Sequence, residues 1–539
     1  MQISRRIGRV CAVVAGASMM LWPALCNGYP LLYPDSISYL GDGRPLARIL
    51  FLHGPKGYSA MRSEIYALGI FSFHWNVTAW PIAAMQALLT SYVLWLVVRS
   101  LAARRVELKF LVMVGVLCLT TSLGWYACLI LPDIMGPVLY LSIYLLVFAR
   151  ETLTMRERWA VSGIAGWTMA AHSTHLILAC GVCLLLGLLL ALRWPPMRAR
   201  GRGVAWVASI AVLTAGTQMV LHDYLYGKPS LNGNRLPYLT ARIVADGPGR
   251  WYLQQHCGQL QWAVCTWAGN LPQTDDDFLW ADSGVWQSAS SDQQEQMLRQ
   301  EIPLALATLR AYPEAQTRVS FNNFREEMGN FGLWDFDPNQ WVESHIDTVL
   351  TGARAHYLRT RQAQSRLPNE FFSTVQQWAV MASALAIVVG VPLLWNRQRR
   401  RILGLAATVV PVVIANAFVT AVFSEVDSRY QSRVIWLVPL TAGLIALDLM
   451  HIRRTREEED ELGEDPAQPS RYHRDCYGLC PRQLRFVHLQ PRAVHGRAWG
   501  GDGGAPQRRA DARRGGGTAA EPHPDIAGAV YAGGCGHLD

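Results

Sequence analysis

The chain has 539 residues, of which 51% are hydrophobic and 17% charged, and its formal net charge is +9. Soluble proteins carry about 25% charged residues, so the composition argues against a soluble globular chain and favours a membrane protein. Most basic residues stand in short clusters between apolar runs, as in cytoplasmic loops, and no nucleic-acid-binding motif accompanies them. We therefore expect membrane lipids as partners and no nucleic acid.

Apolar runs of about 17 to 22 residues recur along the chain, and each is long enough to cross about 30 Å of hydrocarbon. They predict an all-α polytopic membrane protein with about ten transmembrane helices. The basic start of the chain is followed by the apolar stretch 10–26. A cleaved signal peptide is the alternative, but residues 25–28 form no small-x-small cleavage site, so we expect a retained first helix over 7–27. Placing the basic start inside puts the N-terminus in the cytoplasm.

The rest of the N-terminal module follows a first external loop at 28–76. Helices of this module are predicted over residues 77–98, 109–130, 134–149 and 203–221. The segment 159–192 has arginines at both ends, so the chain crosses an even number of times there. One helix of this length would measure about 51 Å, so we predict two helices that meet near His172 and His175. These histidines either titrate, bind a metal or pack at a helix interface, and we favour packing because no carboxylate stands nearby.

The stretch 223–373 is polar, rich in tryptophan and free of any spanning run, which predicts a mainly helical periplasmic domain inserted between the helices. Cys257 and Cys265 lie eight residues apart in it. An oxidising compartment allows a disulfide between them, and two free thiols are the alternative. No Cys-x-x-Cys or histidine-rich spacing predicts a metal site there. The last three helices are predicted over residues 375–395, 402–423 and 434–450.

These elements divide the chain into four parts. They are an N-terminal transmembrane module, a periplasmic domain, a C-terminal transmembrane module and a cytoplasmic tail, at residues 1–222, 223–373, 374–452 and 453–539. The tail turns acidic and then rich in Gly, Arg and Pro, so it cannot bury a core. We expect a disordered extension, and the alternatives are a functional basic tail or an out-of-frame translation.

Charges near a membrane surface are costly unless something uses them, so a site is expected at the external edge. The candidates there are Asp35, Asp133, Arg62, Tyr66, Arg429, Tyr430 and Arg433. A partly desolvated carboxylate has a raised pKa and can take a proton from an incoming hydroxyl, and arginine forks match the oxygens of a departing phosphate. The structural alternative is that the carboxylates cap helices and the arginines reach toward lipid headgroups.

Taken together, these residues and the late external domain resemble the GT-C superfamily of polyprenyl-phosphate-sugar glycosyltransferases, such as membrane mannosyltransferases and aminoarabinose transferases. The resemblance covers roughly residues 5–452. It implies a bacterial inner-membrane enzyme that moves a sugar from a polyprenyl-phosphate donor to a periplasmic lipid, glycan or protein. It also implies roles for the site residues. Asp35 would be the catalytic base, Asp133 a second acidic residue, and Arg62, Arg429 and Arg433 the phosphate ligands, with Tyr66 and Tyr430 beside the substrate.

Other readings stay open. A transporter or flippase would place polar residues near the bilayer midplane and repeat its helices in two halves, and the sequence has neither feature. A noncatalytic envelope assembly protein would keep the fold without the activity. No cofactor is predicted with certainty, and a divalent metal remains an alternative. The transferase hypothesis requires the carboxylates and the arginines of the last helix to converge within about 10–12 Å.

Overall fold

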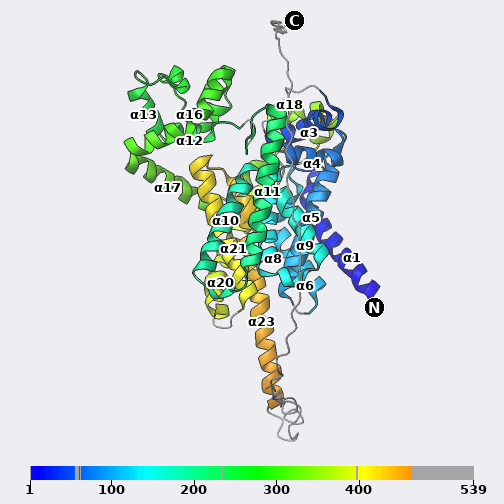
Figure 1. The fold of residues 1–539 in the computed structure, drawn as a ribbon. Coiled ribbons are helices and arrows are strands. Elements are labelled where there is room, and N and C mark those ends of the chain that lie inside the picture. The colour runs from blue at the N-terminus through cyan, green and yellow to red at the C-terminus, as the bar shows by residue number, and fades with distance from the viewer. Residues whose placement is uncertain are drawn as a thin grey trace, which may run out of the picture. The chain divides into compact units, whose positions relative to one another are not determined.

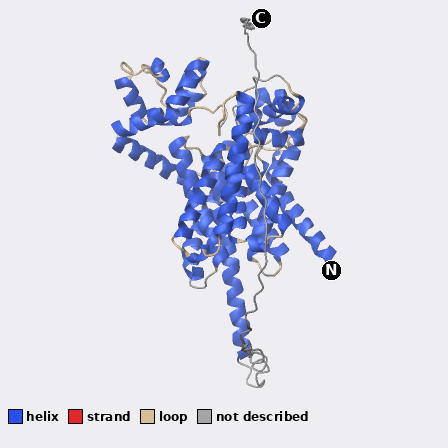
Figure 2. Cartoon of the chain, in the orientation of Figure 1, coloured by secondary structure: helices blue, strands red, loops and turns tan. Residues whose placement is uncertain are grey.

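The computed structural model describes residues 2–54, 60, 62–102, 104–231, 233, 235–395 and 399–463. Within these residues the chain is helical, without a strand, and an isolated backbone bridge joins Leu31 to Leu129 (Figure 2). The all-helical prediction is therefore confirmed. The last helix continues to Gly463, and the remainder of the predicted tail lies outside the described residues.

Six helices in the described part of the chain are long and apolar enough to cross a membrane. They are α5 (Trp80–Leu101), α10 (Ser173–Ala191), α11 (Gly201–Tyr226), α20 (Asn369–Trp395), α21 (Arg400–Phe423) and the pair α22 (Ser428–Ile435) and α23 (Leu437–Gly463), whose apolar part is Ser428–His451. Figure 1 shows most of these helices gathered in one bundle. Their number and composition indicate a multi-pass membrane protein.

Four further helices lie where the other spans were predicted. They are α1 (Gln2–Met20), α6 (Val106–Thr120), α8 (Met135–Phe148) and α9 (Met155–Ala170). The 15 residues of α6 cover only about 22 Å, because the predicted helix 109–130 breaks at Thr121 and resumes as α7 (Leu123–Cys128). The count of about ten spans therefore stays a prediction. Between α9 and α10 the chain breaks at residues 171–172, where two helices were predicted to meet.

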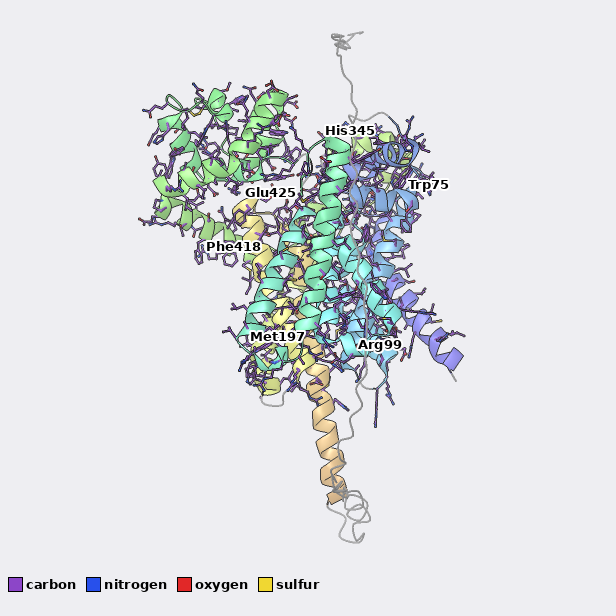
Figure 3. All side chains as sticks on the ribbon, viewed as in Figure 1. Trp75, Arg99, Met197, His345, Phe418 and Glu425 are labelled. Atoms are coloured by element: carbon purple, nitrogen blue, oxygen red, sulfur yellow. A yellow bond between two sulfur atoms is a disulfide. The ribbon has the colours of Figure 1, made fainter. Side chains whose placement is uncertain are left out.

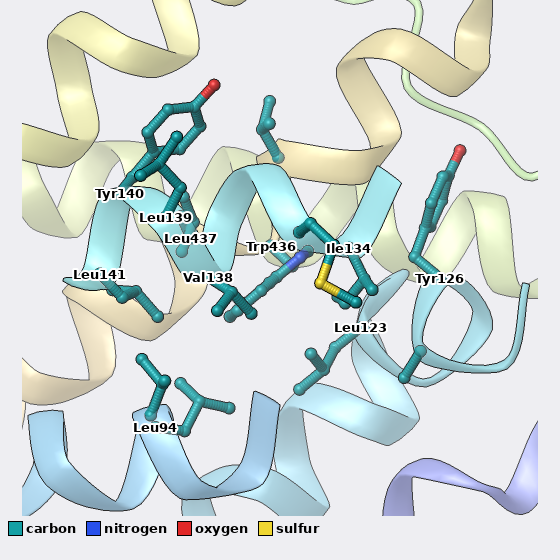
Figure 4. Close-up of a cluster of buried hydrophobic side chains, with 14 of the residues drawn as sticks. Leu94, Leu123, Tyr126, Ile134, Val138, Leu139, Tyr140, Leu141, Trp436 and Leu437 are labelled. Carbon is teal, nitrogen blue, oxygen red and sulfur yellow. The ribbon is translucent and has the colours of Figure 1, made fainter. Parts of the chain in front are cut away.

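The centre of the bundle is α8, all of whose residues are buried. A helix that is apolar on every side is stable only when other helices surround it. Figure 4 shows Val138 and Leu141 of α8 in one cluster with Leu94 of α5, Trp436 and Leu437. This packing fixes the short 3-10 helix η1 (Pro132–Ile134), which precedes α8, relative to α22.

The first external loop, for which the sequence predicted no helix, contains two helices, α3 (Pro34–Leu52) and α4 (Glu64–His74). Pro34 stands at the first helical position of α3, where its missing N–H costs nothing. The two helices pack closely, since a Cβ at Gly43 would lie 2.7 Å from the carbonyl oxygen of Ala67. Charged residues and Pro45 interrupt α3, so its sequence contains no apolar run long enough to predict a membrane span.

Residues 236–304 form a second, smaller core. Its helices are α12 (Tyr238–Ala245), α13 (Pro248–His256), η4 (Ala263–Trp267), α14 (Asp275–Leu279), α15 (Val285–Ser288) and α16 (Ser291–Ala311). Cys257 and Cys265 form a disulfide within it, with their Cα atoms 5.3 Å apart. The predicted domain 223–373 thus has a core of its own in its first part.

The second part of that segment packs onto the bundle instead. Here α17 (Pro313–Gly329) lies along α21, with the rings of Phe324 and Phe418 6.1 Å apart. The 3-10 helix η5 (Trp334–Phe336) and α18 (Gln340–Val349) contribute Phe336 and Val342 to the main core. A short helix, α19 (Ala353–Tyr357), completes the segment before α20. This part of the external segment therefore helps to build the surroundings of η1 and α22.

Candidate functional site

Asp35 lies between two arginines from distant parts of the chain. It belongs to the first turn of α3, where a carboxylate also interacts favourably with the helix dipole. One carboxylate oxygen, Oδ1, is 2.5 Å from Nη2 of Arg62, and the other, Oδ2, is 3.6 Å from Nη1 of Arg429. The structure brings these three candidate residues together. The cap of α3 is Tyr33, so Asp35 does not cap this helix.

Arg62 immediately precedes α4, whose first turn is capped by Ser63. Besides Asp35, the guanidinium of Arg62 donates through Nη1 to the hydroxyl of Tyr238 at 2.8 Å. The ring of Trp280 lies 5.4 Å from the Arg62 guanidinium carbon. Tyr238 packs against the smaller core, and Trp280 directly follows α14 of that core, so this part of the chain lies against one side of the arginine.

Arg429 stands on α22, and only 6% of its surface is exposed. Its guanidinium carbon lies 4.2 Å from the ring centre of Tyr33 and 5.0 Å from that of Tyr430. Nη2 donates to the Tyr430 hydroxyl at 3.3 Å, whereas Nε and Nη1 have no hydrogen-bond partner among the described residues. Buried donors without partners carry a free-energy cost of about 1–3 kcal/mol. Arg429 therefore retains capacity to bind an anion.

Arg433 forms the second half of the cluster, one turn further along α22. Its Nη1 is 3.2 Å from Oδ1 of Asp133, and its Nη2 donates to Oδ1 of Asn416 at 3.1 Å. Asp133 reaches this position because η1 leads directly into α8. The guanidinium carbon of Arg433 also lies 5.0 Å from the Tyr430 ring, so Tyr430 separates the two arginines.

Tyr66 does not join this group of charges. Its hydroxyl donates to Oε1 of Gln86 at 2.6 Å, and its ring packs edge-on against Tyr39 at 4.9 Å. Tyr66 lies in the first turn of α4 and is fully buried. Of the seven residues predicted for the site, six are linked by contacts and Tyr66 lies outside those contacts.

Several acidic residues of the site were not predicted. Asp427 caps α22 by accepting from the backbone N–H of Arg429 at 2.9 Å, and its own N–H donates to Oε2 of Glu327 at 3.0 Å. Glu425 accepts from the hydroxyl of Tyr430 at 2.8 Å. Burial, followed by the charge of Asp427, raises the pKa of Glu425 to about 7. Only the nearness of 425–427 to Arg429 in the sequence signalled these residues.

Asp335 and His172 lie beside the site as well, although the sequence did not place them in this cluster. The patch 334–336 was a candidate sugar-binding surface, with packing in the domain core as the alternative. Ser428 donates to Oδ2 of Asp335 at 2.6 Å, and burial, followed by the charge of Asp427, raises the pKa of Asp335 to about 7. For His172 the sequence favoured packing at a helix interface, with titration and metal binding as the alternatives. Burial first, and then the charges of His175 and of three arginines that include Arg433 and Arg429, lower the pKa of His172 and favour a neutral ring.

A small cleft opens beside the cluster, with a volume of about 220 Å³. Its walls are Leu32, Tyr33, Pro34, Asp335, Asp337, Pro338 and Asn339. In the described residues no three histidine, cysteine or acidic side chains come together in a way that could hold a metal ion. The cluster and the cleft together present arginines, carboxyl groups and tyrosine rings.

The site lies at one end of the bundle. Figure 3 labels Glu425 near this end, and Arg99 and Met197 at the other. Comparison of the chain with protein-family models, with curated proteins and with solved structures finds no match.

Proposed function

We propose that this protein is an integral-membrane glycosyltransferase that moves a sugar from a polyprenyl-phosphate donor to a periplasmic lipid, glycan or protein. One observation carries the proposal: Arg62, Arg429 and Arg433 gather with Asp35 and Asp133 at one end of an apolar helical bundle. A phosphate on a lipid chain is confined to the same depth as the end of such a bundle. Arginines at that depth can therefore meet it directly.

The chemistry of the reaction needs what the cluster offers. When the bond between the sugar C1 and the phosphate oxygen breaks, negative charge remains on the polyprenyl phosphate, and preorganised donors stabilise it. Arg429 has two donor atoms without hydrogen-bond partners in the described residues, and its planar fork matches phosphate oxygens. Asp35 and Asp133 hold Arg62 and Arg433 in position. The GT-C resemblance adds that Asp35 accepts the proton.

The proposal includes ten spans and a periplasmic position for the cluster in a bacterial inner membrane. Basic residues at the opposite end of the bundle support this orientation, because cytoplasmic loops carry an excess of arginine and lysine. They include Arg99, Arg150, Arg158, Arg200 and Arg401.

The binding step can be tested before the sugar is known, with a polyprenyl monophosphate as probe and the full chain in lipid nanodiscs. We expect Arg429→Ala to raise the Kd at least about tenfold, because a hydrogen bond to a charged group is worth about 1.5–3 kcal/mol. Arg318→Ala is the matched control. That arginine is exposed and pairs with Glu314 on α17, so its loss should leave the Kd unchanged.

The transfer step requires a panel of synthetic polyprenyl-phosphate monosaccharides and a measurement of released polyprenyl phosphate. Release that depends on Arg429 supports the glycosyltransferase. A wild-type protein that neither binds the monophosphate nor releases it from any donor refutes the proposal. Binding without release would assign the chain to the flippases or to the noncatalytic assembly proteins.

A further inference from the structure

The cleft beside the cluster shares its walls with the arginine site. Tyr33 forms part of the cleft, and its ring is also the surface against which the Arg429 guanidinium packs, 4.2 Å away. Asp335 lines the cleft too and is bonded to Ser428, the residue before Arg429. A volume of about 220 Å³ corresponds to roughly seven water molecules, since each occupies about 30 Å³ in the liquid. A single ring-sized group can therefore reach the edge of the phosphate site through this cleft.

Asp335 differs from the two carboxylates that the sequence suggested. Both oxygens of Asp35 face an arginine, Arg62 on one side and Arg429 on the other. Asp133 is buried in its pair with Arg433. Among the described residues no arginine comes within ion-pairing distance of Asp335. Its carboxyl accepts from the Ser428 hydroxyl and also faces the carboxyl of Asp427. Asp335 alone among the three lines the cleft.

We propose that this cleft binds the acceptor and that Asp335, rather than Asp35, takes the proton from the acceptor hydroxyl. The inference rests on the proposed glycosyltransferase function. In the step, the acceptor oxygen bonds to the sugar C1 and its proton moves to the Asp335 carboxylate. The bond between C1 and the phosphate oxygen breaks, and the polyprenyl phosphate leaves with the electron pair beside Arg429.

The charged and titratable groups around Asp335 give this reaction its pH dependence. Asp427 and Arg429 face it from the start of α22, Tyr33 from the start of α3 and Tyr126 from α7. Burial and the Asp427 charge bring the pKa of Asp335 to about 7. A general base is most effective when its pKa lies near the working pH. Because only the ionised carboxylate accepts a proton, the rate should rise as the pH increases through about 7.

The residues that line the cleft also restrict which acceptor groups can bind there. Asp335 and Asp337 place two carboxyl groups in the cleft, so an acidic or phosphorylated acceptor group would meet like charge. Asn339 and Tyr33 add polar and aromatic surface. The cleft thus suits an uncharged or cationic group that carries a hydroxyl, such as a neutral sugar ring.

The test uses the full chain in nanodiscs, the donor panel described above and neutral or carboxylated glycans as acceptors. We expect Asp335→Asn to lower kcat by about 10²–10⁴-fold, the range for loss of a general base. The rise in rate near pH 7 should disappear, while the Kd for polyprenyl monophosphate stays as in the wild type. Asp335→Glu should restore part of the rate. Asp292→Asn, a change at an exposed carboxylate on α16, should alter neither kcat nor the pH profile.

The outcomes separate this inference from the function on which it rests. If no donor releases polyprenyl phosphate in the wild type, the proposed function fails and the inference with it. If the wild type is active but Asp335→Asn keeps its kcat and its pH profile, only the inference is overturned. The same holds if Asp335→Asn also loses the lipid phosphate, which would mark Asp335 as structural. Asp35→Asn should instead weaken binding of the monophosphate, because Arg62 and Arg429 lose their shared partner.

Discussion

Arginine–carboxylate pairs occur at both ends of the bundle, but the two ends are built differently. At the end labelled by Arg99 in Figure 3, two arginine side chains each contact a carboxylate through both of their terminal nitrogens. Arg99 contacts Glu157 at 2.6 and 2.9 Å, and Arg200 contacts Glu151 at 2.7 and 3.0 Å. These pairs are partly open to solvent and are complete without any further partner.

At the other end Arg429 and Arg433 are buried, and the pairing of Arg429 is incomplete. The side chains of Arg429 and Arg433 are 7% and 2% exposed, against 17% for Arg99. Arg429 packs against two tyrosine rings and shares Asp35 with Arg62 instead of holding a carboxylate of its own. Arginine pairs in themselves therefore do not mark a site. The nearly complete burial of Arg429 and Arg433 distinguishes their end from the Arg99 end.

The largest effect on stability should come from breaking the buried pair. Asp133→Asn keeps the shape of the side chain but leaves the Arg433 charge uncompensated inside the protein, at a cost of about 3–5 kcal/mol. The measurement is equilibrium unfolding in mixed detergent micelles. In the double variant with Arg433→Met, most of the loss should be recovered, because no unpaired charge remains. A loss that persists in the double variant would show that packing around η1, and not charge, sets the stability of this end.

An effect that grows with pH is expected at Glu327, which is fully buried where α17 meets the loop before α22. Burial raises the pKa of this carboxyl to about 9, so the folded protein binds the proton more tightly than the unfolded chain. Stability should therefore fall as the pH rises from the ordinary glutamate pKa toward about 9. A pKa difference of one unit is worth about 1.4 kcal/mol.

Glu327→Gln removes this titration. The variant should unfold at a higher temperature than the wild type near pH 8 and at a similar temperature near pH 5, as measured by thermal melts across that range. Asp292→Asn, at an exposed carboxylate, serves as the control. Parallel curves for the wild type and Glu327→Gln would count against a protonated Glu327 in the folded protein.

The sequence predicted the shared location of Asp35, Arg62 and Arg429 because their placement follows from topology. Each stands next to a helix end, and basic clusters at the opposite ends assign these helix ends to one face of the bundle. The same reasoning grouped Tyr66 with Arg62. In the structure α4 begins between Arg62 and Tyr66, and the Tyr66 hydroxyl bonds to Gln86 instead. No local sequence pattern predicts this orientation.

The acidic part of the site could not be predicted in the same way. Glu327 and Asp335 come from a polar segment without spanning periodicity, about a hundred residues before their partners Asp427 and Ser428. Their positions depend on α17 and η5 packing against the bundle. Tertiary contacts of this kind leave no local pattern in a sequence. For the same reason α3 and α4 were expected only as a loop.

The smallest effect should come from the Arg99 end, and it tests the comparison directly. Glu157→Gln removes one charge from an arginine–carboxylate pair, as Asp133→Asn does at the other end, and it is equally conservative in shape. Because water reaches both side chains, which are 17% and 16% exposed, we expect a loss of about 1 kcal/mol or less. Equilibrium unfolding in the same micelles measures both variants. If Glu157→Gln destabilised the protein as much as Asp133→Asn, burial of the arginines would not be what separates the two ends.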